Sequence, residues 1–344
     1  MVQIKLGYCL TTGIGSLPLT DSKVACSKIL KSYDIPFWPQ LPKIGFSENM
    51  YAQFSQGIPG IIIEDERIYV DSSQDLNSMI ENILQDFVDE RNESYAIEKD
   101  YATGLYDFLE LSDELKNSRY IKGQITGPIS YGLQVCDKNR KPLLYNESLM
   151  DIVLKVLIMK LKWQEDMLRK LNKNTIMFLD EPLLNVLGSA FVSLTESQVI
   201  DYLNQTVSSI RGTSGIHCCG NTNWGIVMNS GTDIVSFDAY NYGTNFILYH
   251  KEIAEFLERG GIIAWGIVPS SPNIRDETPE TIVRMFNVLV KKLVNNGIDK
   301  RLLVERSLIT PSCGTGSLTA EEDELVSKYI GKVAQIVKKE YGVV

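Results

Sequence analysis

The chain is poor in histidine, with only His217 and His250 among its 344 residues. It lacks any apolar run near the roughly 20 residues that a helix needs to cross a bilayer, so we expect no membrane partner. It also has no basic stripe interleaved with aromatic residues, and its net charge of −9 argues against a nucleic-acid partner. The first residues match a secretory signal poorly, because Gly and Thr soon interrupt their apolar stretch. We therefore expect a cytoplasmic location.

Internal repeats, low-complexity tracts and Gly/Ser linkers are absent from the sequence as well, so no composition shift marks a domain boundary. Hydrophobic residues make up 44% and charged residues 22%, which is ordinary for a globular protein. We expect one domain over 1–344. The six cysteines are expected to be free thiols, because a chain of this size needs no disulfide framework. Three of them, Cys9, Cys26 and Cys136, are expected to pack as small core residues.

Short apolar runs alternate with amphipathic segments along most of the chain, which predicts an α/β fold built as a (β/α)8 TIM barrel. The expected strands are TTGIGS (11–16), IPFWP (35–39), YIKGQITG (120–127), TIMFLDE (175–181), SGIHCC (214–219), DIVSFDA (233–239), GIIAWGIV (261–268) and LLVERSLIT (302–310). IPFWP is the weakest of them because it contains two prolines. The expected helices are 145–173, 195–210, 247–259, 278–297 and 320–340.

Residues 64–118 are the best candidate for an added element on the barrel. A strand-like IIIEDERIYV leads into this stretch, and acidic segments with apolar residues at three- and four-residue spacing follow. We therefore expect a hairpin and a helical insertion in the N-terminal part of the chain.

Several predicted strands end in chemically reactive residues. His217 and Cys219 close one strand, and Cys313 follows the last one. One imidazole and two thiolates suit Zn²⁺, and three protein ligands with a fourth position open are typical of a catalytic metal. Cys218 is expected to point to the opposite face, because side chains alternate along a strand. The sequence thus predicts a divided zinc site whose chemistry is the activation of a thiol.

Five short motifs support a family resemblance that spans nearly the whole chain: IGSLP near the N-terminus, ITGP at 125–128, LDEP at 179–182, the His-x-Cys of 217–219 and PSCG at 311–314. Together they resemble the superfamily of barrel enzymes that holds cobalamin-independent methionine synthase, methylcobalamin:coenzyme M methyltransferase and uroporphyrinogen decarboxylase. The resemblance implies a zinc-dependent methyl transfer to a thiol, most simply homocysteine, to give methionine.

The resemblance also implies roles for individual residues. The residues that match the synthase zinc ligands are His217, Cys219, Cys313 and Asp238, the last of which stands where the synthase has a Glu. Asp180 matches an acidic residue that binds the amino group of the acceptor.

Ser16 matches the GS turn beside that carboxylate, and Gln56 replaces a Glu of the synthase substrate site. Asp180 and Asp238 are thus the expected catalytic carboxylates, and Ser16, Gln56 and Asp180 the expected substrate contacts. The synthase's catalytic histidine is missing, because Ser270 or Ser271 stands at its place.

The methyl donor is left open by the sequence. Only one barrel's length of chain is given, and single-barrel relatives resemble enzymes that take methyl from a corrinoid, often carried by a separate protein. A methylcorrinoid is therefore favoured over methyltetrahydrofolate, with a corrinoid protein as a potential partner.

Four alternatives remain at this stage: a coenzyme M-type methyltransferase, a uroporphyrinogen decarboxylase-like enzyme, a non-catalytic partner of a corrinoid protein, and a purely structural zinc site. The tryptophans Trp38, Trp224 and Trp265 are expected to pack inside the barrel rather than to line a pocket.

Overall fold

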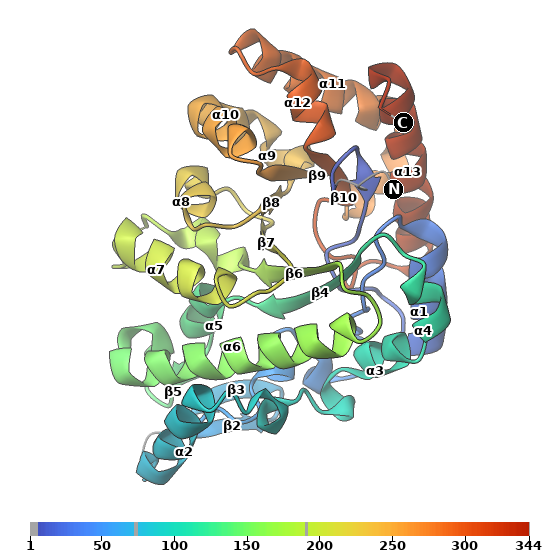
Figure 1. Cartoon of the computed structure of the whole chain (residues 1–344). Coiled ribbons are helices and arrows are strands. Elements are labelled where there is room, and N and C mark those ends of the chain that lie inside the picture. Colours follow the sequence, from blue (N-terminus) through green and yellow to red (C-terminus); the bar gives the residue numbers. More distant parts are fainter. Residues whose placement is uncertain (1–5, 72–74, 190–191, 344) are drawn as a thin grey trace.

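The computed structural model describes residues 6–71, 75–189 and 192–343 (Figure 1). In this part of the chain, seven strands form one curled sheet in the order β1-β10-β9-β8-β7-β6-β4, and every neighbouring pair is parallel. Their bounds are Leu10–Thr11 (β1), Ile121–Thr126 (β4), Thr175–Asp180 (β6), Thr213–Cys218 (β7), Ile234–Phe237 (β8), Ile262–Val268 (β9) and Ser307–Pro311 (β10).

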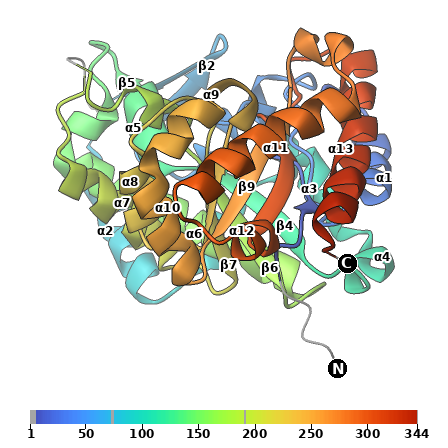
Figure 2. The same cartoon turned by 90° about the horizontal axis from the view of Figure 1, so that it is seen from above.

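Helices follow the strands and cover the outside of the sheet (Figures 1 and 2). Their bounds are Ser22–Ser32 (α1), Pro128–Gln134 (α5), Glu147–Arg169 (α6), Glu196–Val207 (α7), Trp224–Asn229 (α8), Ala239–Phe246 (α9), His250–Glu258 (α10), Pro279–Asn295 (α11), Lys300–Glu305 (α12) and Ala320–Tyr341 (α13). Helices cover the outer face of the sheet and its curl encloses the inner face, so β4, β6 and β9 are buried at every position.

The helix ends follow local capping chemistry. Thr195, Thr278 and Thr319 each form a reciprocal capping box with the residue three positions on, at the start of α7, α11 and α13. At its other end α13 stops at Gly342, which has a left-handed backbone. The five helices expected from periodicity are all present, with ends shifted by a few residues.

The expected closed barrel of eight regular strands is only partly confirmed. The segment 35–40 lies between β1 and β4, where the eighth strand would stand. The Ile35 amide donates to Thr11 (2.9 Å) and the Lys122 amide to Pro36 (2.8 Å), so the segment bonds to both edges. It forms only isolated bridges, however, because Pro36 and Pro39 have no N–H to donate.

Two other strand predictions were wrong in part. The expected strand 302–310 begins as helix α12, and only its second half is β10. The expected strand 11–16 is reduced to β1, which ends at Thr11.

A separate small sheet stands beside the seven-stranded sheet. Strands β2 (Ile61–Glu64) and β3 (Arg67–Val70) form an antiparallel hairpin, and β5 (Cys136–Asp137) pairs with β3 in parallel. The hairpin turn is Asp65-Glu66, with both residues at positive φ (47° and 56°), the geometry that matches the twist of the flanking strands. Helices α2 (Asn77–Val88), α3 (Thr103–Leu109) and α4 (Ser112–Lys116) then lead to β4.

Within the described residues, no helix combines the length and the apolar character that crossing a bilayer requires.

Candidate metal centre and its cavity

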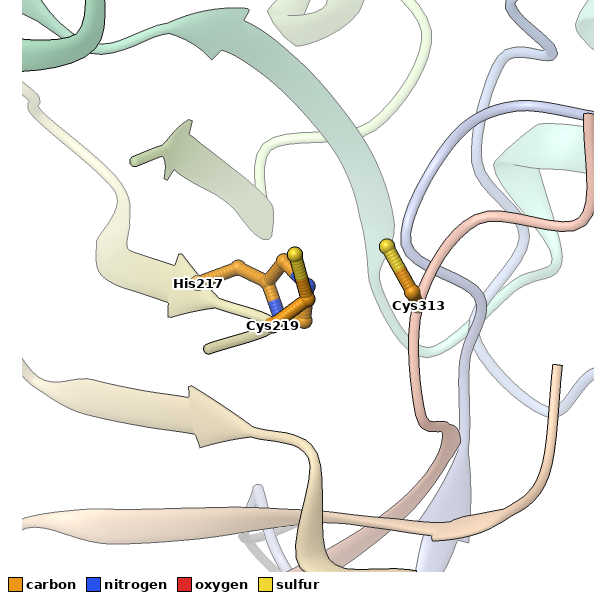
Figure 3. A group of neighbouring side chains, drawn as sticks. All are labelled: His217, Cys219 and Cys313. Atoms are coloured by element: carbon orange, nitrogen blue, oxygen red, sulfur yellow. The ribbon is translucent and has the colours of Figure 1, made fainter. Parts of the chain in front are cut away.

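Three side chains from distant parts of the sequence meet at the carboxyl ends of the strands (Figure 3). His217 lies near the end of β7, Cys219 follows that strand, and Cys313 lies in the turn after β10. The imidazole nitrogen and the two sulfurs offered by these residues all lie within 4.8 Å of one another. That spacing suits one Zn²⁺ ion bonded at about 2.0–2.3 Å to each atom after small side-chain rotations.

The imidazole of His217 is held in one orientation. Strand pairing sets His217 opposite Ser236, and Nδ1 lies 2.9 Å from the Ser236 hydroxyl oxygen. His217 is only 2% exposed, yet its Nε2 has no hydrogen-bond partner among the described residues. A buried ring nitrogen without a partner is costly unless something else bonds to it, so Nε2 is placed as a metal ligand would be.

The two thiols lie close enough for each to shift the pKa of the other. A hydrogen bond from Cys313 and, more weakly, the proximity of His217 lower the pKa of Cys219, whereas the pKa of Cys313 is raised by the same contact and by burial. A thiolate at Cys219 is the form that binds metal. Cys218 lies on the opposite face, fully buried, with its sulfur 3.5 Å from the Gly220 carbonyl oxygen.

Asp180 ends β6 and is paired in register with His217. Its Oδ1 is buried without a hydrogen-bond partner among the described residues, and Asp180 is 6% exposed. Burial raises the pKa of Asp180 to about 6, an effect that the charges of Lys122 and His217 partly offset. The carboxylate is therefore a buried acceptor that a cationic ligand group can satisfy.

Lys122, on β4, is fully buried within the curled sheet. Its Nζ donates to the Ile14 carbonyl oxygen (2.6 Å) and to the Gln124 Oε1 (3.0 Å), and lies 4.6 Å from the Phe178 ring centroid. Burial lowers the pKa of Lys122 to about 7. Lys122 thereby ties β4 to the segment that carries Ser16.

The neighbouring carboxylate, Glu181, serves the fold. It accepts hydrogen bonds from the Ile129 and Ser130 amides (3.0 and 2.7 Å) and so caps the N-terminus of α5. Gly127 makes room for it, because a Cβ at this position would lie 2.2 Å from the Glu181 Oε1. The ITGP and LDEP motifs are thus two halves of one packing unit.

A cavity of about 250 Å³ opens onto the three candidate ligands. Ser16 lies on its wall, with its hydroxyl 3.3 Å from the Gly316 amide that donates to it. The lining consists of Ile14, Ser16, Gln40, Pro42, Glu48, Asn49, Met50, Asp180, Pro182, His217, Cys219, Cys313 and Gly314. The structure therefore brings together Ser16, Asp180 and the three candidate metal ligands.

Two expected site residues are placed differently. Both carboxylate oxygens of Asp238 accept from Asn241, from its amide at 2.9 Å and its side chain at 2.6 Å, so Asp238 caps α9. Among the described residues it is not part of the three-residue ligand group. Gln56 does not line the cavity, and its side chain accepts from the Glu98 amide at 3.4 Å.

Ser270, at the place of the missing histidine, bonds to Ser312 at 2.8 Å and is likewise outside the cavity lining.

The sequence missed Glu48, Asn49 and Met50, which lie in an irregular segment over the cavity. Thr126 fixes this segment by donating to the Met50 carbonyl oxygen at 2.5 Å. Glu48 is 1% exposed and accepts from the Thr103 amide at 2.8 Å. Sequence periodicity gave no signal here, because the segment consists of two short 3₁₀ turns, Phe46–Glu48 and Ala52–Phe54.

The tryptophans Trp38, Trp224 and Trp265 are fully buried, and none lines the cavity. Cys9 and Cys26 are core residues, as expected. The expectation for Cys136 was wrong: it is half-buried and lines a second cleft.

Fold and site together define a protein with a curled parallel α/β sheet whose mouth carries a His/Cys/Cys cluster. Among solved structures, the chain is similar to a methyltransferase from Methanosarcina mazei (12% identity, 95% of this chain and 94% of that chain covered, TM-score 0.51). It is also similar to a protein from Listeria monocytogenes assigned as a vitamin-B12 independent methionine synthase (11% identity, 97% and 99% covered, TM-score 0.52). At these identities the likeness shows that the fold is shared.

A B12-independent methionine synthase from Shewanella sp. W3-18-1, solved with selenomethionine, also matches, at 17% identity with 69% of this chain and 68% of that chain covered and a TM-score of 0.48. Comparisons with protein-family models and with curated proteins find no match.

Proposed function

We propose that the protein is a zinc-dependent methyltransferase that methylates a small thiol, with homocysteine as acceptor and methionine as product. One observation carries the proposal: the buried, unpartnered Nε2 of His217 lies beside two cysteine sulfurs at the wall of a cavity of about 250 Å³. Soft ligands of this kind suit Zn²⁺, and the contact with the cavity favours a catalytic over a closed structural site.

His217, Cys219 and Cys313 would hold the zinc, and the bound ion would supply a thiolate at neutral pH from a substrate thiol. The chain's own residues prepare the site. Ser236 fixes the imidazole, and the fold brings the sulfurs of Cys219 and Cys313 within 4.8 Å of each other. The turn that carries Ser16 and the end of β6 then position the acceptor beside the cluster.

Asp180 would orient the acceptor by binding its ammonium group. Its unpartnered Oδ1 is free to accept a charge-assisted hydrogen bond, worth about 1.5–3 kcal/mol. Asp238 is not proposed as the fourth ligand, because both of its carboxylate oxygens accept hydrogen bonds from Asn241 at the start of α9.

The cavity lining also separates the alternatives. Its described residues contain the carboxylates Glu48 and Asp180 but no Arg or Lys. Coenzyme M carries a sulfonate, and a uroporphyrinogen carries several carboxylates, so both would call for basic groups. The lining therefore supports homocysteine, an amino acid with an ammonium group, as the acceptor.

The donor is proposed to be a methylcorrinoid or methyltetrahydrofolate, and a corrinoid protein is a proposed partner. We do not propose nucleic acid or a membrane as a partner. We propose that the protein is cytoplasmic.

The test begins with metal analysis of the purified protein, for which we expect about one zinc per chain. Cys313→Ser should lose zinc with the fold intact, whereas Cys26→Ser, at a buried cysteine outside the cluster, should keep it. Methyl transfer to homocysteine is then assayed with methylcobalamin and with methyltetrahydrofolate. Absence of zinc after reconstitution would remove the mechanism, and zinc without turnover with either donor would favour a non-catalytic role.

A further inference from the structure

The turn that carries Ser16 lies against the turn that follows β10. The Ser16 carbonyl oxygen accepts from the Thr315 amide at 2.8 Å, and the Ser16 hydroxyl accepts from the Gly316 amide at 3.3 Å. No side chain separates the two turns here, because a Cβ at Gly314 would lie 2.1 Å from the Ser16 Oγ. On its other side, Ser16 forms an isolated bridge with Gln40. The place of Ser16 at the cavity wall therefore depends on the turn after β10.

Thr315 connects this contact to a buried charge. Its hydroxyl donates to the Asp323 Oδ1 at 2.6 Å and also lies 3.1 Å from the Ser16 carbonyl oxygen. A hydroxyl has one proton to donate, and the charged carboxylate at the shorter distance is the stronger acceptor. Thr315 is 2% exposed, and Asp323 is fully buried. The side chain of Thr315 is therefore held by Asp323, while its amide holds Ser16.

Asp323 is paired with a cation from the other end of the chain. Its second carboxylate oxygen, on α13, bonds to the Lys28 Nζ on α1, and the two helices lie side by side (Figures 1 and 2). A buried carboxylate is costly without its partner, so this pair resists separation. Lys43 adds a further bond, because its Nζ donates to the Leu318 carbonyl oxygen at 2.6 Å. The turn after β10, which also carries Cys313, is thus held by the N-terminal part of the chain.

We propose that Thr315 is a positioning residue, which keeps the Ser16 turn and the Cys313 turn at one fixed separation. Resting on the proposed function, the first turn holds the acceptor and the second holds the metal, so Thr315 sets the approach of the acceptor to the cluster. Thr315 is not among the residues that line the cavity, and it acts only through its neighbours. Asp323 and Lys28 act in turn through Thr315.

The test removes the hydroxyl and keeps the size of the side chain. Thr315→Val loses the bond to Asp323, whereas Thr315→Ser keeps the hydroxyl and serves as the rescue. Thr206→Val is the matched control, because Thr206 is 1% exposed and its hydroxyl donates to the Tyr202 carbonyl oxygen at 3.0 Å on α7, outside the cavity lining. Both valine variants lose one buried hydrogen bond, so a loss of stability alone affects them alike.

The first measurement needs no activity. Zinc-free protein is alkylated, and the labelling rate of Cys313, which is half-buried, is read by mass spectrometry. We expect roughly fivefold faster labelling in Thr315→Val, through local opening of the turn, and wild-type rates in Thr315→Ser and Thr206→Val. Lys28→Met, which leaves Thr315 in place, should accelerate labelling roughly threefold. This variant decides the question if Thr315→Val does not fold.

The second measurement uses zinc-loaded protein. Methionine should bind Thr315→Val roughly tenfold more weakly by calorimetry, with zinc content unchanged, and should bind Thr315→Ser and Thr206→Val normally. Labelling of Cys313 in Thr315→Val at the wild-type rate, equally fast labelling in Thr206→Val or Thr315→Ser, or normal methionine binding by Thr315→Val would overturn the role of Thr315. A wild-type protein that takes up no zinc or binds no methionine refutes the proposed function instead, and the labelling rates then decide whether Thr315 holds the two turns together.

Discussion

Removing the hydroxyl that orients His217 should weaken zinc binding without removing any ligand. Ser236 is fully buried on β8, and its hydroxyl lies 2.9 Å from the Nδ1 of His217. Loss of a group that supports a metal ligand typically lowers metal affinity 10–100-fold, or about 1.4–2.7 kcal/mol. We expect Ser236→Ala to fall in this range, because the imidazole can then rotate away from the two sulfurs.

The chain offers a closely matched control. Ser307 is also fully buried on a strand and also binds an aromatic ring nitrogen, the Nε1 of Trp265, at 2.9 Å. Both variants lose a buried hydrogen bond, which costs about 1–3 kcal/mol of folding stability. Only Ser236→Ala should weaken zinc in competition with a chromogenic chelator. Equal zinc affinity in the two variants, at equal loss of stability, would refute the proposed orientation of His217.

Three further predictions address the cavity and its supports. Since burial raises the pKa of Asp180 to about 6 in the metal-free site, zinc-free protein should bind methionine, through its ammonium, about tenfold more tightly at pH 7 than at pH 5 by calorimetry, and Asp180→Asn should abolish this rise. Gly127→Ala should lower the free energy of unfolding, measured in urea, by about 1–3 kcal/mol, because the new Cβ clashes with Glu181, which caps α5. Gly331→Ala, in open space on α13, should instead raise it by about 0.5–1 kcal/mol. Asp238→Ala should lose about 0.5–2 kcal/mol of stability as a helix cap. Unchanged zinc affinity in that variant is expected, and a large loss would restore Asp238 as a ligand.

The cluster could be predicted from sequence because strand ends converge in a parallel sheet. His217, Cys219 and Cys313 each lie at or just after the end of a strand, so the fold brings them to one mouth. Alternation along β7 also predicted that Cys218 faces away. These inferences depend on regular geometry, which repeats from residue to residue.

Irregular segments limited the prediction. The stretch 46–54 lies over the cavity in short 3₁₀ turns, where no period shows which side chain faces inward. A resemblance pointed to Gln56, whereas Glu48, Asn49 and Met50 line the cavity.

Lys122 was missed for a different reason. The sequence places this lysine in a strand, but it does not show that the Ile14 carbonyl and the Phe178 ring enclose the side chain. Likewise, β5 lies outside the predicted insertion of 64–118, because its pairing with β3 depends on tertiary contact.

The last ligand to be synthesised decides when the cluster can assemble. Cys219 and His217 leave the ribosome long before Cys313, which lies in the turn after β10. A nascent chain that ends before this turn holds one imidazole and one thiol of the cluster, too few to retain a metal ion firmly. Metal loading of the proposed site would therefore come late in biogenesis, and it would report that the third and fourth quarters of the polypeptide have docked.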